Sequence, residues 1–139
     1  MSESRAVLDK VRAAYTAWGE SKGGSVAAWL ELMGDRIDFR SLANGQPHVP
    51  WTRSHTTPDG VRIYLDGLLS AFRMEHFTVE RYICEGDTIV VVAECAWTNK
   101  VTGRRIEMPK VDIWRFRNGK AIAFHEFYDT AQVASAMSA

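Results

Sequence analysis

The sequence predicts an α+β fold in which a curved, largely antiparallel sheet wraps over helices. Apolar residues recur at helical spacing through most of the first 72 residues, with one short alternating segment between them. From residue 77 onward the period changes to two, and short turn-forming segments separate the alternating stretches. The 139 residues suffice for one hydrophobic core, so we expect a single domain over residues 1–139.

Two helices are expected at the start of the chain. The first spans about residues 3 to 19, and its apolar face carries Val7, Val11, Ala14, Tyr15 and Trp18. The segment "SKGG" at 21–24 ends it. Ser25 can cap a second, short helix, "VAAWLELM", which stops at Gly34.

A short strand and a third helix follow. The segment "DRIDFRSL" alternates, with Ile37 and Phe39 on one side and Asp38 and Arg40 on the other. Residues 43–57 form a loop with two prolines. Thr57 and Pro58 are a favourable start for a helix. Its apolar face comprises Val61, Tyr64, Leu65, Leu68, Leu69 and Phe72.

Four strands are expected after residue 77, at about 77–84, 88–98, 105–117 and 120–128. The connections "EGD", "NKVTG" and "NG" are short, so the strands form an antiparallel meander. Asp129 or Thr130 then caps a short C-terminal helix, "AQVASAM".

Composition argues against several classes of function. Lys plus Arg equals Asp plus Glu at 17 each, so no basic excess is present to bind nucleic acid. No apolar run approaches the length of a membrane span, and the N-terminus is polar, without the apolar region of a signal peptide. We therefore expect a cytoplasmic protein.

Cysteine and histidine spacing predicts neither a disulfide nor a metal site. In the expected hairpin Cys84 lies opposite a residue near 88 and Cys95 opposite one near 77, so the two thiols are not partners. A CxxC motif, an HxxxH motif and an HxH motif are all absent. We expect no metal and no cofactor.

The order of these elements and the segment "VDIWRFRNGKAIAFHEFYD" (111–129) resemble the nuclear transport factor 2-like superfamily, in its SnoaL-like or ketosteroid-isomerase-like branch. The resemblance covers essentially the whole chain. It implies a cone-shaped curved sheet, antiparallel or mixed, wrapped over three N-terminal helices around an interior pocket, with a short C-terminal helix. It also implies dimerisation through the outer face of the sheet. The fold hosts isomerases, cyclases, dehydratases, hydrolases and non-catalytic proteins, so it implies no single activity.

Comparison with the ketosteroid isomerases gives candidate site residues. Asp112 aligns with their protonated, oxyanion-binding Asp, and Tyr15 resembles their second donor. Their general base aligns with Arg40, which cannot abstract a proton, although Asp38 on the same face could replace it. In the epoxide hydrolases of the superfamily, the first two catalytic positions align with Ala93 and Cys95, and only the third, Glu126, keeps a carboxylate.

Alternation also predicts which strand residues face the pocket. On 88–98 the inward set is Ile89, Val91, Ala93, Cys95 and Trp97, because the alternate set contains Glu94 and Thr98. On 105–117 Trp114 and Phe116 share the face of Asp112.

The turn "RNGK" leaves the facing of the last strand open. A two-residue type I′ turn at Asn118-Gly119 sets Asp112 opposite His125, whereas a three-residue turn with a Gly119 bulge sets it opposite Glu126. Side-chain size favours Glu126 inward and His125 outward. The bulkier set, which suits a pocket wall, is Ile122, Phe124, Glu126 and Tyr128.

The sequence is compatible with three functions. The first is a cofactor-independent enzyme that encloses a small, largely apolar molecule and transfers protons. Asp112 and Glu126, with Asp38 as a further candidate, would be acid and base, Tyr15 a donor, and Arg40 an anchor. The other expected ligand contacts are Trp97, Trp114, Phe124 and Tyr128, with Trp51 and His55 on the loop over the cone mouth. The second is a binding module, and the third an interaction domain whose interior Trp97 and Trp114 fill.

Two further alternatives concern charge and assembly. Arg40, Asp38 and Glu126 could instead form a buried ion cluster without chemistry. The outer face is apolar enough to suggest a homodimer. Its apolar residues are Val90, Val92, Ala96, Ile113, Ala123 and Phe127.

Overall fold

The computed structural model describes residues 2–138, with side chains described from residue 4. Helices α1 (Ser2–Glu20) and α2 (Val26–Leu32) precede strand β1 (Met33–Ser41), and a short 3-10 helix, η1 (Pro50–Thr52), precedes helix α3 (Pro58–Ala71). Four strands follow: β2 (Phe72–Glu85), β3 (Thr88–Asn99), β4 (Arg105–Arg117) and β5 (Lys120–Phe127). Helix α4 (Thr130–Met137) ends the described chain.

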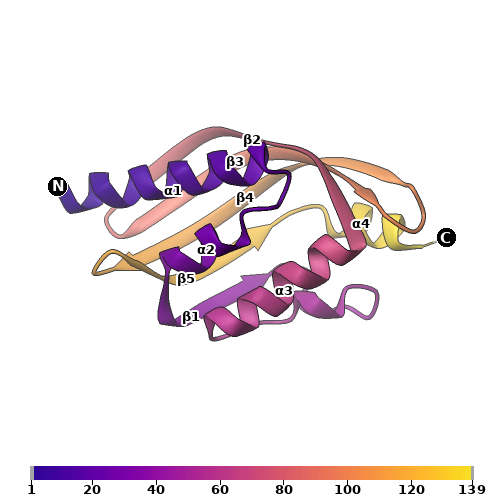
Figure 1. The fold of residues 1–139 in the computed structure, drawn as a ribbon, viewed down its shortest axis with the longest axis horizontal. Coiled ribbons are helices and arrows are strands. Elements are labelled where there is room, and N and C mark those ends of the chain that lie inside the picture. The colour runs from indigo at the N-terminus through magenta and orange to yellow at the C-terminus, as the bar shows by residue number, and fades with distance from the viewer. Residues whose placement is uncertain (1, 139) are drawn as a thin grey trace.

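The five strands form one mixed sheet in the order β1-β5-β4-β3-β2 (Figure 1). Strands β2 to β5 are the expected antiparallel meander, and β1 pairs with β5 in parallel. The early strand is thus adjacent to the last one. This pairing places residues that are about 85 positions apart in the chain side by side, such as Ser41 and Glu126.

Helices α1, α2 and α3 pack against one face of this sheet (Figure 1). The core between the layers contains the apolar face of α1, the Trp29 side chain of α2, and the inward residues of the strands. The expected inward set of β3 is buried throughout, from Ile89 to Trp97. The predicted α+β fold, with a curved sheet over three helices and a short C-terminal helix, is confirmed.

Element boundaries agree with the sequence to within about two residues, except at the start of β2. Thr57 caps α3 as predicted, because its hydroxyl accepts a hydrogen bond from Gly60 N. Ser25 precedes α2 but its side chain makes no capping bond. Strand β2 begins at Phe72, about five residues earlier than expected. We assigned Phe72 to the apolar face of the preceding helix, but its backbone is already extended. Extra residues between Met74 and His76, and between Val79 and Arg81, interrupt its alternation.

The β4–β5 hairpin combines the two registers that the sequence left open. Asn118 and Gly119 both have positive φ, at 51° and 76°, and Arg117 pairs with Lys120, so the turn has two residues. The three-residue turn that we linked to an inward Glu126 is therefore wrong. The pairing of Asp112 with Glu126 is nevertheless present.

A bulge within β5 restores that pairing. Arg115 pairs with Ala123 while Phe116 pairs with Ala121, so the residue between the two alanines, Ile122, has no partner on β4. One extra residue changes the facing of everything beyond it. Glu126 is consequently buried, and His125 lies on the outer face opposite Ile113, as we expected from side-chain size.

The two cysteines are not opposite each other, as the expected hairpin predicted. Cys84 pairs with Ile89 and Cys95 with Phe77, and both thiols are free. Among residues 2–138, no helix has the length and apolar character needed to cross a membrane.

Candidate functional site

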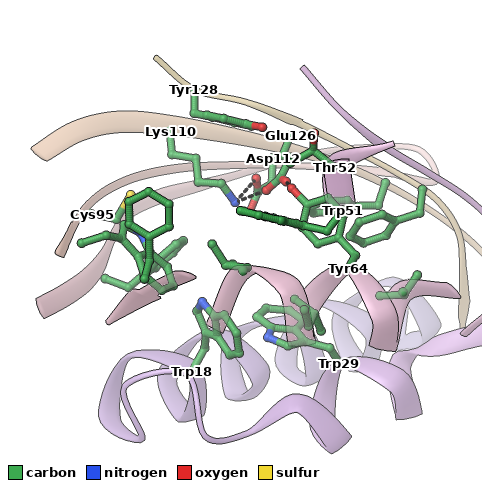
Figure 2. A pocket seen from close by; sticks show the side chains of 18 of the residues that line it. Trp18, Trp29, Trp51, Thr52, Tyr64, Cys95, Lys110, Asp112, Glu126 and Tyr128 are labelled. Carbon is green, nitrogen blue, oxygen red and sulfur yellow. Dashed lines mark hydrogen bonds and ion pairs between the residues drawn. The ribbon is translucent and has the colours of Figure 1, made fainter. Parts of the chain in front are cut away.

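An internal cavity of about 110 Å³ lies between the sheet and the helices (Figure 2). Its wall is mostly aromatic and aliphatic. The tryptophans in it are Trp18, Trp29, Trp51, Trp97 and Trp114. Three lining residues have ionisable groups that are charged in water at neutral pH, namely Lys110, Asp112 and Glu126. Since few, well-placed polar groups in an apolar cavity are typical of small-molecule sites, this is the candidate functional site.

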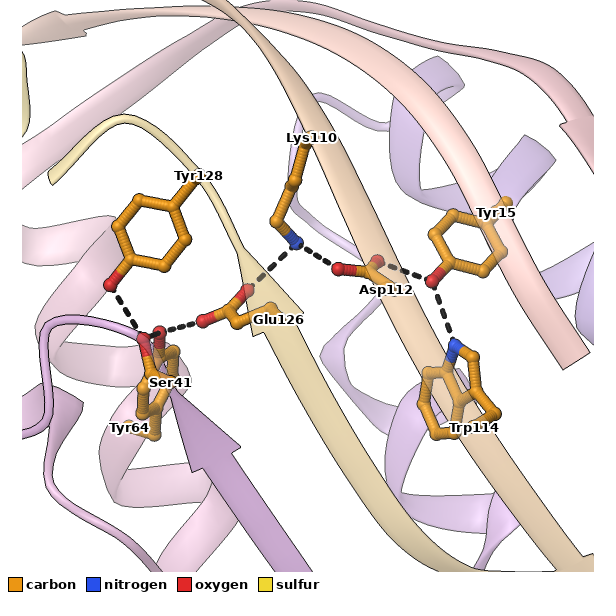
Figure 3. Close-up of polar contacts among 8 residues, drawn as sticks. All are labelled: Tyr15, Ser41, Tyr64, Lys110, Asp112, Trp114, Glu126 and Tyr128. Atoms are coloured by element: carbon orange, nitrogen blue, oxygen red, sulfur yellow. Dashed lines mark hydrogen bonds and ion pairs between the residues drawn. The ribbon is translucent and has the colours of Figure 1, made fainter. Parts of the chain in front are cut away.

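Lys110 bridges the two carboxylates (Figure 3). Its Nζ lies 2.9 Å from Asp112 Oδ1 and 2.7 Å from Glu126 Oε2. The three side chains are 15%, 3% and 9% exposed, so the cluster is almost wholly removed from water. The ammonium also lies 5.5 Å from the ring centre of Phe77 and 5.8 Å from that of Phe124, within the range of cation–π contacts.

Asp112 is held from its other side by Tyr15 and Trp114. The Tyr15 hydroxyl donates to Asp112 Oδ2 at 2.5 Å, and Trp114 Nε1 donates to the Tyr15 oxygen at 2.8 Å. Asp112 Oδ1, in contrast, makes no hydrogen bond of good geometry within residues 2–138, apart from its ion-pair contact with Lys110. This oxygen is itself buried, and the Lys110 ammonium is the group that compensates its charge.

Glu126 is held by a second set of hydroxyl groups on β1, α3 and the end of β5 (Figure 3). The Tyr64 hydroxyl donates to Glu126 Oε1. Tyr64 is also hydrogen-bonded to Ser41 Oγ, which in turn lies 2.5 Å from the Tyr128 hydroxyl. Ser41 is the direct partner of Glu126 in the β1–β5 register, which explains why this serine reaches the site.

Burial and the charges of neighbouring groups together shift the pKa values of the site residues. Burial raises the pKa of the Asp112 carboxyl; Lys110 opposes this rise and Glu126 adds to it. Burial also raises the pKa of the Tyr15 and Tyr64 phenols, so both remain protonated donors at neutral pH. The pKa of Lys110 is raised, because attraction to the two carboxylates outweighs the lowering effect of burial. Lys110 is thus an ammonium and not an amine nucleophile.

Most predicted site residues line the cavity. Those that do are Tyr15, Trp51, Trp97, Asp112, Trp114, Phe124, Glu126 and Tyr128. Trp97 and Trp114 are part of the wall and leave the cavity open, so the expectation of an interior filled by these two indoles is wrong. His55 is buried beside the site, where its Nε2 lies 3.3 Å from the Trp51 carbonyl oxygen, but it does not line the cavity.

Asp38 and Arg40 are not in the site, which corrects their predicted roles as base and anchor. Their carboxylate and guanidinium pair with each other on the surface, at 3.0 and 2.8 Å, with side chains 53% and 57% exposed. The reason is the alternation of β1: the apolar residues Ile37 and Phe39 take the core face, and their neighbours point outward. A buried ion cluster of Arg40, Asp38 and Glu126 is excluded by the same arrangement.

Lys110 is the main residue that the sequence prediction missed. The signal was present, because Lys110 has the same parity as the inward residues Asp112 and Trp114 of β4. The inward face of this strand was assigned only for Asp112, Trp114 and Phe116, and it was not extended back to Lys110. Tyr64 was assigned to the apolar face of α3, and nothing in the sequence placed its hydroxyl next to Glu126.

The outer face of the sheet is apolar as expected, with one correction. Val90, Val92 and Ile113 are partly exposed, but Ala96 is fully buried. His76 and Glu107, its partners on the two neighbouring strands, close over it with a hydrogen bond of 3.1 Å.

Comparison with known proteins agrees with this fold and cavity. The family model of the SnoaL-like domain matches residues 11–124. A search of curated proteins finds no match. Among solved structures, an NTF2-like protein of unknown function from Burkholderia pseudomallei is similar, with 22% identity and a TM-score of 0.82 over 96% of this chain and 98% of that one.

Two other solved structures are similar over the same extent. An NTF2-like protein from Burkholderia thailandensis has 24% identity and a TM-score of 0.79, covering 96% of this chain and 98% of that chain. TerC, co-crystallised with polyporic acid, has 16% identity and a TM-score of 0.78 with the same coverage. At these identities the structures show the fold alone, and the family match carries the assignment. The chain belongs to the SnoaL-like domain family, within the NTF2-like fold.

Proposed function

We propose that this protein binds a small, largely apolar molecule with a carbonyl oxygen and transfers a proton at the carbon next to that carbonyl. The observation that carries the proposal is the Lys110–Asp112–Glu126 cluster, the ionised part of an otherwise apolar cavity. The co-crystallisation of TerC with polyporic acid supports a small-molecule ligand for this fold. An isomerisation, cyclisation, dehydration or hydration would each use such a proton transfer.

Lys110 is the group that would bind the carbonyl oxygen. An ammonium has three donors, and two of them are directed at Asp112 and Glu126. Within the described residues, the third donor of the ammonium is available to a ligand oxygen. A donor of fixed charge in a water-poor cavity stabilises negative charge that develops on an oxygen far more than it would in bulk water.

Glu126 would act as the base. Its Oε2 lies 2.7 Å from Lys110 Nζ, so a carbon bonded to a carbonyl held at Nζ lies next to the carboxylate. The carboxylate takes the proton, the C–H electrons move to the carbonyl oxygen, and Lys110 stabilises the enolate. Glu126 then returns a proton to the substrate. Asp112 holds the Lys110 ammonium from its other side, and Tyr15 positions Asp112 by its hydrogen bond to Oδ2.

The test is exchange of the α-protons of cyclohexanone in deuterium oxide, followed by NMR. Loss of a general base lowers rates by about 10²–10⁴-fold, so Glu126→Gln should abolish most of the protein-dependent exchange. Glu94→Gln is the matched control, since Glu94 is an exposed glutamate on the outward face of β3. Exchange that is equal in Glu126→Gln and wild type would reject the assignment.

A non-catalytic binding module is the second candidate. It is favoured by the observation that the Tyr15 and Tyr64 hydroxyls already donate to the two carboxylates, which leaves fewer groups for chemistry. This function predicts saturable binding of cyclohexanone with no exchange above the rate in buffer.

We also propose a cytoplasmic homodimer that associates through the outer face of the sheet. The support is the partly exposed apolar surface around Ile113 and Phe127, and the exposed, unpaired thiol of Cys84 suits a reducing compartment. Analytical ultracentrifugation should show a dimer that Ile113→Arg dissociates. A monomer in the wild-type protein would contradict this part of the proposal.

A further inference from the structure

A row of hydroxyl groups connects Glu126 to the end of β5 (Figure 3). The Tyr64 hydroxyl contacts both Glu126 Oε1 and Ser41 Oγ, the latter at 2.9 Å. Ser41 Oγ lies 2.5 Å from the Tyr128 hydroxyl. Glu126, Tyr64 and Ser41 are buried, whereas Tyr128 is partly exposed and precedes the exposed Asp129.

The Tyr64 hydroxyl has one hydrogen and two acceptors, so it can donate to one of them at a time. When Glu126 is a carboxylate, the hydrogen of Tyr64 points to Oε1. When Glu126 is protonated, the carboxyl itself can donate to Tyr64, and the hydrogen of Tyr64 is then released to Ser41. The row therefore has two states, and the protonation of Glu126 selects between them.

We propose that Tyr64, Ser41 and Tyr128 form a proton relay that carries the proton of Glu126 to solvent. This inference rests on the proposed role of Glu126 as base. The Glu126 proton moves to the Tyr64 oxygen, the Tyr64 proton to Ser41, the Ser41 proton to Tyr128, and the Tyr128 proton to water. At each hydroxyl one O–H bond breaks and one forms, so all three remain neutral.

The groups that surround Glu126 show why it would need a separate path for its proton. The charged or titratable groups facing it are the Lys110 ammonium, its strand partner Asp112, and the Tyr64 phenol, with Tyr128 beyond Ser41. Ser41 and Tyr64 are buried, so water does not provide an equivalent route through this side of the carboxylate. A base that cannot lose its proton can only return it to the substrate.

That consequence gives the first test, isomerisation of cyclohex-3-enone to cyclohex-2-enone in deuterium oxide. With the relay intact, the abstracted proton exchanges with solvent and the product contains deuterium. In Tyr128→Phe the proton returns to the product, so its deuterium content should fall by more than half. Tyr128 does not contact Glu126. A merely structural role of Tyr128 would therefore change the rate of isomerisation and not the deuterium content of the product. Tyr82→Phe, a partly buried tyrosine outside the row, is the control.

Equal deuterium content in wild type and Tyr128→Phe would overturn the relay while leaving the proposed function intact. Absence of isomerisation in the wild-type protein would instead count against the proposed function. A second measurement then tests the relay without any ligand. After a rapid drop in pH, the infrared carboxyl band of Glu126, assigned by its loss in Glu126→Gln, should appear about tenfold or more slowly in Tyr128→Phe and in Ser41→Ala. Unchanged kinetics in both variants would overturn the relay.

Discussion

Replacing Lys110 by Met should destabilise the protein more than almost any other single change at the site. The methionine keeps the length of the side chain but removes the charge that both carboxylates contact, at 2.9 and 2.7 Å. Asp112 and Glu126 then remain buried without a counterion. Removing one partner of a buried ion pair costs about 3–5 kcal/mol, a large part of the roughly 5–15 kcal/mol that stabilises a typical domain.

Urea unfolding at pH 7 measures this loss. With a slope of about 2 kcal/mol per molar urea, the midpoint should fall by roughly 2 M. Lys10→Met, a change of an exposed lysine on α1, should leave it nearly unchanged. Adding Asp112→Asn to Lys110→Met should recover part of the stability, because one of the two uncompensated charges is gone. A loss below about 1 kcal/mol, or no recovery in the double variant, would refute the electrostatic account.

The same variant should show a defined dependence on pH. The folded-state pKa of Lys110 is raised, so its stabilisation is fully present below the ordinary value of 10.5 and is lost only as the pH rises through the folded value. In Lys110→Met the chief influence that lowers the pKa of Asp112 is removed. The variant should therefore be most stable below the ordinary carboxyl value of 3.8 and lose stability as the pH rises through the raised value.

Three further changes test other parts of the structure. Tyr15→Phe removes both the donor to Asp112 and the acceptor of Trp114 Nε1, and should cost about 1–3 kcal/mol in urea unfolding, whereas no loss would show that these bonds are dispensable. Gly67→Ala should displace the indole of Trp51, because a Cβ at Gly67 would lie 2.5 Å from that side chain. The displacement should shift the tryptophan emission and weaken the retention of an apolar ligand. An unchanged emission spectrum would contradict this prediction. Deleting Ile122 should either unfold the protein or turn His125 inward, and a folded deletion variant with unchanged α-proton exchange would show that the bulge does not set the facing of Glu126.

Much of the fold could be predicted because local signals and burial agreed. Helices α1 and α3 have continuous apolar faces, and Thr57 with Pro58 gives a clear start to α3. Strands β3 and β4 alternate apart from the buried Ala96, so their inward residues followed from parity. In β2 the alternation is interrupted by two bulges, which is why its first residues could not be distinguished from the end of the helix.

The site was predicted only in part, because its geometry depends on pairing between distant segments. Asp112 and Tyr15 were found through the resemblance to the ketosteroid isomerases, and Glu126 through the alignment with the epoxide hydrolases of the superfamily. All three line the cavity. Arg40 was misplaced because the alignment was preferred to the alternation of β1, which already assigned it to the outer side. The facing of Glu126 was predicted correctly from side-chain size, although it arises from the bulge at Ile122 and not from the turn.

The central claim is that Lys110 polarises a carbonyl oxygen inside the cavity. The most direct measurement is the infrared carbonyl stretch of cyclohex-2-enone bound to the protein. A charged donor should lower this frequency in the wild-type protein relative to the Lys110→Met/Asp112→Asn variant, where the band should move toward its value in an apolar solvent. A bound carbonyl with the same frequency in both proteins would contradict the account.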